Sequence, residues 1–212
     1  MTAPEVIGLP QSNYVRTVRI ACIEKGVAYS LTVVRPQSPE AKAIHPLGKI
    51  PGFRHDGVEL CESRAICGYV DTAFPGPPLV PRDPLGAARC EQWISMINTS
   101  INPVLMGDYL RGYFFSGLPD GAPDRARIDA ALPKVRDMFA LLERELSARE
   151  YLAGDAFSLA DAFLLPVLHY MRQLPETKEI MAASPHVTAW YDRVMARPSG
   201  AGTVPPPPPG RG

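Results

Sequence analysis

The chain has 212 residues, of which 46% are hydrophobic and 21% charged, the composition of an ordinary globular protein. Basic and acidic residues both number 22, so the chain lacks the charge excess typical of nucleic-acid or anionic-membrane binders. No segment approaches the roughly 18 apolar residues that cross a bilayer, and no signal peptide is visible. The four cysteines include no Cys-x-x-Cys pair, and the sequence therefore predicts a cytoplasmic protein with reduced thiols.

Strand and helix patterns alternate through the first part of the chain. Residues 6–9 predict a strand, and the helix that follows begins at Ser12 and stops before Gly26, a residue suited to a left-handed cap. Residues 29–34 predict a second strand, parallel to the first because it follows a βα connection. Further along, the patterns predict a short helix or turn at 39–44, a hairpin of strands at 52–55 and 58–61, and a helix at 63–74.

Clustered prolines mark the domain boundaries. The stretch FPGPPLVPRDPLG at 74–86 has no periodicity, and each proline ring fixes φ, which predicts a semi-extended linker. The ending TVPPPPPGRG is typical of a polyproline II or disordered tail. We therefore expect a first domain at 1–75, a linker at 76–86, a second domain at 87–200 and a disordered tail at 201–212.

The second domain is expected to be all helical. Its third helix is apolar nearly all round, which predicts a buried central helix. The sequence Ser158-Leu-Ala-Asp161 before and within that helix forms a capping box, for which we expect a structural role only, with a cost of about 1 kcal/mol when Asp161 becomes Ala. The expected helices span 85–110, 125–150, 159–173 and 186–197.

Three motifs together resemble the cytosolic glutathione S-transferase family. They are SNYVRTVRIA at 12–21 ending in EKG, the pair His45–Phe53 and Glu62–Ile66, and Gly154–Asp161. The resemblance is to a bacterial-type member with a Ser-type active site, and it covers roughly residues 5–198. It implies an α/β N-terminal thioredoxin-like domain plus an all-α C-terminal helical bundle, with glutathione as co-substrate.

Ile50, Pro51, Glu62 and Ser63 are the expected core of a glutathione site. Ile50-Pro51 resembles the cis-proline site of the family, where the Ile50 backbone would pair with the cysteinyl backbone of glutathione like an added strand. Ser63 at a helix start would hold the γ-glutamyl carboxylate, and Glu62 would accept the ammonium group. The alternatives are an ordinary turn proline and a plain N-cap serine with Glu62 in the first turn.

Lys49 and His45 complete the expected glutathione-binding set. Lys49 resembles the position that faces the glycyl carboxylate, while His45 stands where relatives often have Asn. Exposed loop residues of these types are also commonly just solvated. The four histidines show no metal-ligand spacing, so no metal is expected.

Ser12 is the expected catalytic residue. A free thiol has a pKa near 8.5, so a hydroxyl that donates to the sulfur at a helix N-terminus would favour the thiolate. The alternative is that Ser12 only caps the helix. Tyr14 is a rival because some relatives use a phenol, and Gln11 and Asn13 are other possible donors.

The reaction partner is the least determined part. Cys22 is expected to be an inert core residue and Cys61 a structural one, and thiol-transferring relatives place Cys where Ser12 stands. Conjugation of glutathione to a hydrophobic electrophile, as in detoxification, is therefore preferred. A non-catalytic glutathione or ligand carrier and a glutathione-dependent peroxidase or dehalogenase are the alternatives, and the resemblance implies a homodimer.

The expected acceptor site comprises Tyr14, Met106, Tyr109 and Tyr113, with Leu110, Phe114 and Phe115 nearby; core packing is the alternative for each.

Overall fold

A computed structural model describes residues 2–206, which divide into two compact units. The first comprises the chain up to Val80 together with residues from Met195 onward, and the second comprises Pro81–Val194. A four-stranded sheet lies in the first unit, and the regular elements of the second are helical. An α/β unit and a helical unit are the two parts that the sequence predicted.

The sheet has the strand order β2-β1-β3-β4. β1 (Glu5–Ile7) pairs in parallel with β2 (Ser30–Thr32) and antiparallel with β3 (Gly52–His55), which forms the predicted hairpin with β4 (Val58–Cys61). β1 ends earlier than predicted because Gly8, with φ at +146°, turns the chain toward the first helix.

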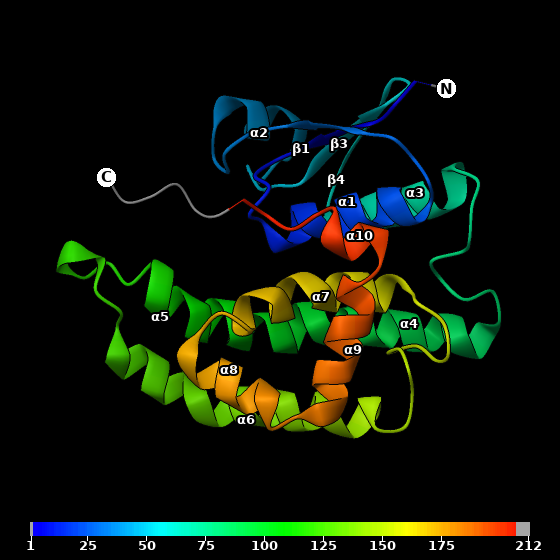
Figure 1. The fold of residues 1–212 in the computed structure, drawn as a ribbon. Helices are drawn as coiled ribbons and strands as arrows, with labels where there is room; N and C mark the ends of the chain where they lie inside the picture. The colour runs from blue at the N-terminus through cyan, green and yellow to red at the C-terminus, as the bar shows by residue number, and fades with distance from the viewer. Residues whose placement is uncertain (1, 207–212) are drawn as a thin grey trace. The chain divides into compact units, whose positions relative to one another are not determined.

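Helices cover both faces of this sheet. α1 (Asn13–Glu24) and α3 (Ser63–Ala73) pack together on one side, and α2 (Pro39–Ile44) lies on the other (Figure 1). Val15 and Val18 on α1 are fully inaccessible, so this face of the helix belongs to the core of the unit. This packing fixes the two helix N-termini that begin near Ser12 and Ser63.

The proline-rich stretch after α3 is held against the first unit. Asp71 on α3 accepts hydrogen bonds from the N–H groups of Leu79 (2.8 Å) and Val80 (3.2 Å). The buried Lys25 ammonium forms an ion pair with Asp71 at 3.2 Å and donates to the Pro77 carbonyl at 3.1 Å. These bonds fix the path of the proline-rich stretch in addition to the restriction that the proline rings place on φ. The stretch ends at Asp83, the N-cap of the next helix.

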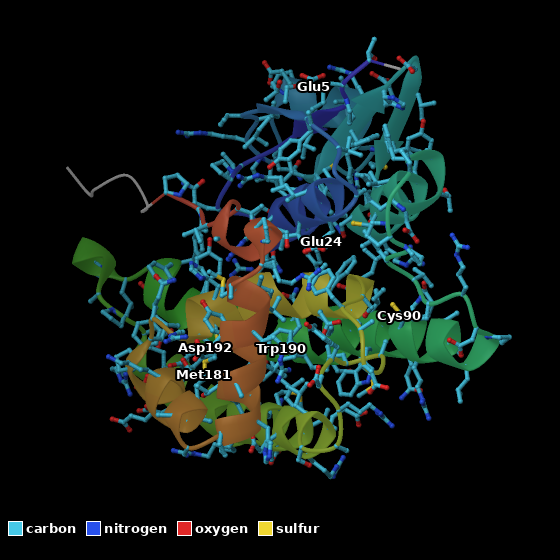
Figure 2. The ribbon with its side chains drawn as sticks, turned by 45° about the vertical axis from the view of Figure 1, so that its right-hand side comes forward. Glu5, Glu24, Cys90, Met181, Trp190 and Asp192 are labelled. Carbon is cyan, nitrogen blue, oxygen red and sulfur yellow. The ribbon has the colours of Figure 1, made fainter. Side chains whose placement is uncertain are left out.

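The end of the described chain belongs to the first unit rather than to the helical one. α10 (Pro198–Ala201) packs on α1, and Thr203, expected in a disordered tail, is fully buried. Arg16 reaches this segment through Nε to Thr203 Oγ1 (3.1 Å) and Nη2 to the Gly200 carbonyl (3.1 Å). Glu24, labelled on α1 in Figure 2, receives two bonds from Arg197 at 2.8 and 2.7 Å. Most of the proline run, at 207–212, lies outside the described residues.

The second unit contains two short α-helices that were not predicted, α5 (Arg111–Phe114) and α8 (Pro175–Ala182), in addition to the four expected helical regions. The expected helix at 85–110 changes its winding along its length. It is α-helical as α4 (Pro84–Met96) and then π-helical over Ile97–Ile101 and Pro103–Leu110. Pro103 has no N–H to donate and its ring crowds the preceding turn, which favours the wider winding. The remaining helices are α5 (Arg111–Phe114), α6 (Arg125–Leu146), α7 (Leu159–Met171), α8 (Pro175–Ala182) and α9 (Pro185–Met195), with a 3₁₀ turn at Pro119–Gly121.

The predicted central helix and its capping box are both present. Residues of α7 from Leu159 to Leu168 are all buried. Asp161 at its third position accepts from the Ser158 N–H (2.9 Å), the Leu152 N–H (3.0 Å) and Trp190 Nε1 (2.8 Å), Trp190 being labelled on α9 in Figure 2. Among residues 2–206, no helix is both long and apolar enough to cross a membrane.

Candidate active site

Ser12 is the N-cap of α1 and is half-buried. Its Oγ accepts a long hydrogen bond from the Val15 N–H at 3.4 Å. Because this bond uses a lone pair, the hydroxyl hydrogen remains able to donate to a ligand atom. The N–H groups of the first turn of α1 add a partial positive charge at the same place. Capping and thiolate stabilisation are therefore compatible roles for one hydroxyl.

Ile50 lies close to the loop that carries Ser12. The Ile50–Pro51 peptide bond is cis, as the resemblance implied, and Ile50 stands outside the strands, two residues before β3. A Cβ on Gly8 would lie 3.0 Å from Ile50 Cβ and 2.6 Å from Val15 Cγ2. Only glycine therefore allows the Ile50 turn to approach the start of α1 this closely. Gly8 is a residue of the site that sequence reasoning missed.

Glu62 and Ser63 stand where β4 meets α3. Ser63 is the first residue of α3 and is buried, and Glu62 occupies the N-cap position without a capping bond from its side chain. The alternative of a plain N-cap serine is therefore wrong, because the cap falls one residue earlier. Glu62 has φ at +68° and ψ at 114°, a conformation that is strained for a residue with a side chain.

His45 and Lys49 lie on the loop between α2 and β3. His45 is 4% exposed, and its Nε2 lies 3.2 Å from Glu62 Oε1, so it contacts another predicted site residue directly. Lys49 is exposed and enters none of the ion pairs found within residues 2–206. The structure thus places Ser12, Ile50, Glu62 and their neighbours in one unit, with Lys49 as an open cation at its edge.

The predicted acceptor residues fall into both units. Tyr14 lies in the first turn of α1, while Met106, Tyr109 and Tyr113 lie on the helical run after α4. Met106 is half-buried, and Tyr109 is completely buried. The hydroxyls of Tyr109 and Tyr113 both donate to Glu176 Oε2, the former at 2.8 Å. Both phenol hydroxyls therefore already donate a hydrogen bond to a carboxylate of the helical unit.

Glu176 is the centre of a charged cluster that the sequence did not reveal. Arg125 donates to its Oε1 at 2.7 Å and to Asp129 at 2.7 Å. Partial burial alone would raise the pKa of Glu176, but the bonds from Tyr113, Tyr109 and Arg125 outweigh it and lower this pKa to about 2. Burial and the adjacent carboxylate raise the pKa of Tyr109. Neither phenol is suited to acid–base chemistry near neutral pH.

Three of the four cysteines are buried and poorly suited to act as nucleophiles. Burial raises the pKa of Cys22 to about 12 and also raises the pKa of Cys67 and Cys90. Cys61 is half-buried on β4, and all four thiols are free. Among the described residues, no group of three or more His, Cys, Asp or Glu side chains could hold a metal ion.

A thioredoxin-like sheet with a cis-proline turn, followed by an all-helical unit, is the glutathione transferase fold that the sequence resemblance implied. Residues 6–78 match the family described as glutathione S-transferase, N-terminal domain, and residues 101–198 match its C-terminal domain. Glutathione S-transferase 3 of Zea mays is 32% identical over 98% of both chains, and glutathione S-transferase F10 of Arabidopsis thaliana is 31% identical over 84% of this chain and 86% of its own. The chain belongs to the glutathione S-transferase family.

Solved structures agree with this assignment. Glutathione transferase F7 from Populus trichocarpa superposes with a TM-score of 0.85 at 28% identity, covering 94% of this chain and 97% of its own. Glutathione S-transferase I from maize, in complex with an atrazine glutathione conjugate, gives a TM-score of 0.83 at 27% identity, covering 95% and 96%. The predicted glutathione transferase fold is confirmed, whereas the bacterial-type, Ser-type subdivision stays a prediction.

Proposed function

We propose that this protein is a glutathione S-transferase that uses Ser12 to hold the glutathione sulfur as a thiolate for attack on a hydrophobic electrophile. The observation that carries the proposal is the half-buried Ser12 hydroxyl at the α1 N-terminus, which follows a loop whose Gly8 closely approaches Ile50 of the cis-proline turn. Family membership supports glutathione as the co-substrate, as does the related maize enzyme whose structure holds a glutathione conjugate.

Each part of glutathione has a matching group in the first unit. The γ-glutamyl carboxylate would sit on Ser63 and the free N–H groups at the start of α3, and its ammonium group on Glu62. The cysteinyl backbone would pair with Ile50, and the glycyl carboxylate would meet Lys49. Three anchors along the tripeptide fix the position of its sulfur relative to Ser12.

The chemical step needs only a thiolate and a leaving group. The thiol loses its proton to solvent, and the Ser12 O–H and the helix dipole stabilise the negative sulfur. With 1-chloro-2,4-dinitrobenzene, the sulfur forms a bond to the ring carbon and chloride leaves with the bonding electrons. Three of the four cysteines are buried, which disfavours disulfide exchange through their thiols.

Substitution of Ser12 by Ala tests this role. We expect kcat with 1-chloro-2,4-dinitrobenzene to fall roughly tenfold to a hundredfold, while the Kd for glutathione by calorimetry changes little. The ultraviolet absorbance of the bound thiolate should titrate at higher pH in the variant than in the wild type. Equal rates and equal titrations would remove Ser12 from the mechanism, and glutathione binding with no turnover in the wild type would favour a carrier.

We also propose that the protein acts as a cytoplasmic homodimer, as is usual in its family. Light scattering on the purified chain would give twice the monomer mass of 23.1 kDa if this is correct. A monomer mass at micromolar concentration would contradict the dimer without affecting the role of Ser12.

A further inference from the structure

His45 is a buried side chain that joins two walls of the glutathione site. It is the C-cap of α2, its N–H donating to the Ala41 carbonyl at 2.8 Å, and its ring reaches the N-cap of α3. The His45 side chain is 5% exposed, whereas the Glu62 side chain that it contacts is 64% exposed. The imidazole therefore supports Glu62 from the protein interior rather than facing solvent.

Both ring nitrogens of His45 have defined roles. The Leu47 N–H donates to Nδ1 at 3.1 Å, so Nδ1 carries no hydrogen. The ring hydrogen is then on Nε2, which lies 3.2 Å from Glu62 Oε1 and donates to it. One neutral tautomer satisfies both bonds, and it connects the loop that carries Lys49 to the carboxylate of Glu62.

Glu62 has little else to fix its carboxylate. Its backbone is strained at φ +68°, its side chain makes no capping bond, and most of that side chain is exposed. A long exposed glutamate samples many rotamers, and fixing one of them at the moment of binding costs affinity. A directed bond from a buried ring selects the rotamer beforehand and leaves Oε2 for a ligand.

We infer that His45 is a positioning residue that orients Glu62 for the ammonium group of the γ-glutamyl moiety, without touching glutathione itself. The inference rests on the proposed function, because it assigns Glu62 to that ammonium. The loop is braced from its other side: the Gln37 N–H donates to the Gly48 carbonyl at 2.7 Å, and Gln37 Nε2 to the Leu47 carbonyl at 2.9 Å. Loss of the ring should thus free Glu62 more than it disturbs the loop.

A comparison of two ligands isolates this role. Glutathione and its glutaryl analogue, glutaryl-cysteinylglycine, differ only in the amino group that Glu62 would bind. In the wild type we expect calorimetry to show glutathione binding about tenfold more tightly than the analogue. In His45→Leu, glutathione affinity should fall roughly three- to tenfold while the affinity of the analogue stays nearly constant.

Two amide variants separate the bonds of the ring. The Gln side chain can place an N–H where Nε2 stands, whereas the Asn side chain can replace only Nδ1. His45→Gln should therefore restore most of the preference for glutathione, and His45→Asn should not. In turnover with 1-chloro-2,4-dinitrobenzene, His45→Leu should raise the KM for glutathione more than it lowers kcat.

His55→Leu is the matched control, because His55 is also a buried histidine of this unit, bonded through Nδ1 to the Tyr69 hydroxyl at 2.9 Å. It should leave the ratio of the two affinities unchanged. The inference is overturned if His45→Leu weakens both ligands equally, or if His55→Leu reduces the ratio as much. If the wild type binds neither ligand, the proposed function itself fails, which is a distinguishable result.

Discussion

At the scale of single residues, the sequence proposed candidate side chains for the site but not their geometry. Ile50-Pro51 and Glu62-Ser63 could be proposed because residue types and their spacing can be read directly from the sequence. The positive φ of Glu62 could not be predicted, because glutamate seldom adopts a positive φ and no local sequence pattern indicates it. The pairing of His45 with Glu62 bridges 17 positions and depends on the packing of α2 beside β4.

The strain at Glu62 leads to a prediction with a matched pair of variants. Glu62→Ala and Glu62→Gly both remove the carboxylate, so both should weaken glutathione binding about tenfold or more. Glu62→Gly should be more stable than Glu62→Ala by about 1 kcal/mol, because glycine relieves the clash of Cβ at positive φ. Urea unfolding and calorimetry on both variants measure the two effects, and equal stabilities would show that the backbone relaxes at this position.

At the scale of elements, long periodic helices and the hairpin were predictable, and short or context-dependent elements were not. The hairpin bounds 52–55 and 58–61 agree with the structure because Asp56-Gly57 specifies the turn. α8 is only eight residues long and was missed, although Pro175 at its first position is a start signal. The π-helical winding after Met96 depends on one proline within an otherwise ordinary helical pattern.

The capping box of α7 should contribute more stability than its sequence signature suggested. Asp161 is completely buried and accepts from two backbone N–H groups, the Ser158 hydroxyl and the Trp190 indole. Asp161→Ala leaves several buried donors without a partner, at about 1–3 kcal/mol each. We therefore expect a loss of about 3 kcal/mol or more, rather than the 1 kcal/mol of an exposed cap.

Thermal or urea unfolding of Asp161→Ala measures this cost, and Asp155→Ala is a suitable control because Asp155 is exposed on the loop before the same helix. The control should unfold as the wild type does. A loss near 1 kcal/mol for Asp161→Ala would mean that water replaces the carboxylate in the cavity it leaves.

At the scale of the whole molecule, the free energy of unfolding should decrease at acid pH because Glu176 becomes protonated. Its pKa is lowered from 4.5 to about 2 in the folded protein, so the unfolded chain binds a proton more readily than the folded one. The stability that the ionised carboxylate contributes is therefore fully present above pH 4.5 and is lost as the pH falls toward 2. Glu176→Gln removes this contribution.

Urea unfolding between pH 7 and pH 2 provides the measurement. The difference in unfolding free energy between wild type and Glu176→Gln should be constant above pH 5 and shrink below it. The exposed Glu179 on the same helix offers a control, Glu179→Gln, that should show no such convergence. A difference that stays constant down to pH 2 would contradict the role of the cluster around Glu176.

The docking of residues 197–203 on α1 also determines the order in which the protein can be completed during synthesis. The bond from Arg16 to Thr203 joins residues 187 positions apart, so the helical unit is inserted in the chain between two pieces of the first. A ribosome would release the whole helical unit before the groups that cover Arg16 exist. The first unit should thus stay partly open on the nascent chain until residues 197–203 have left the ribosome.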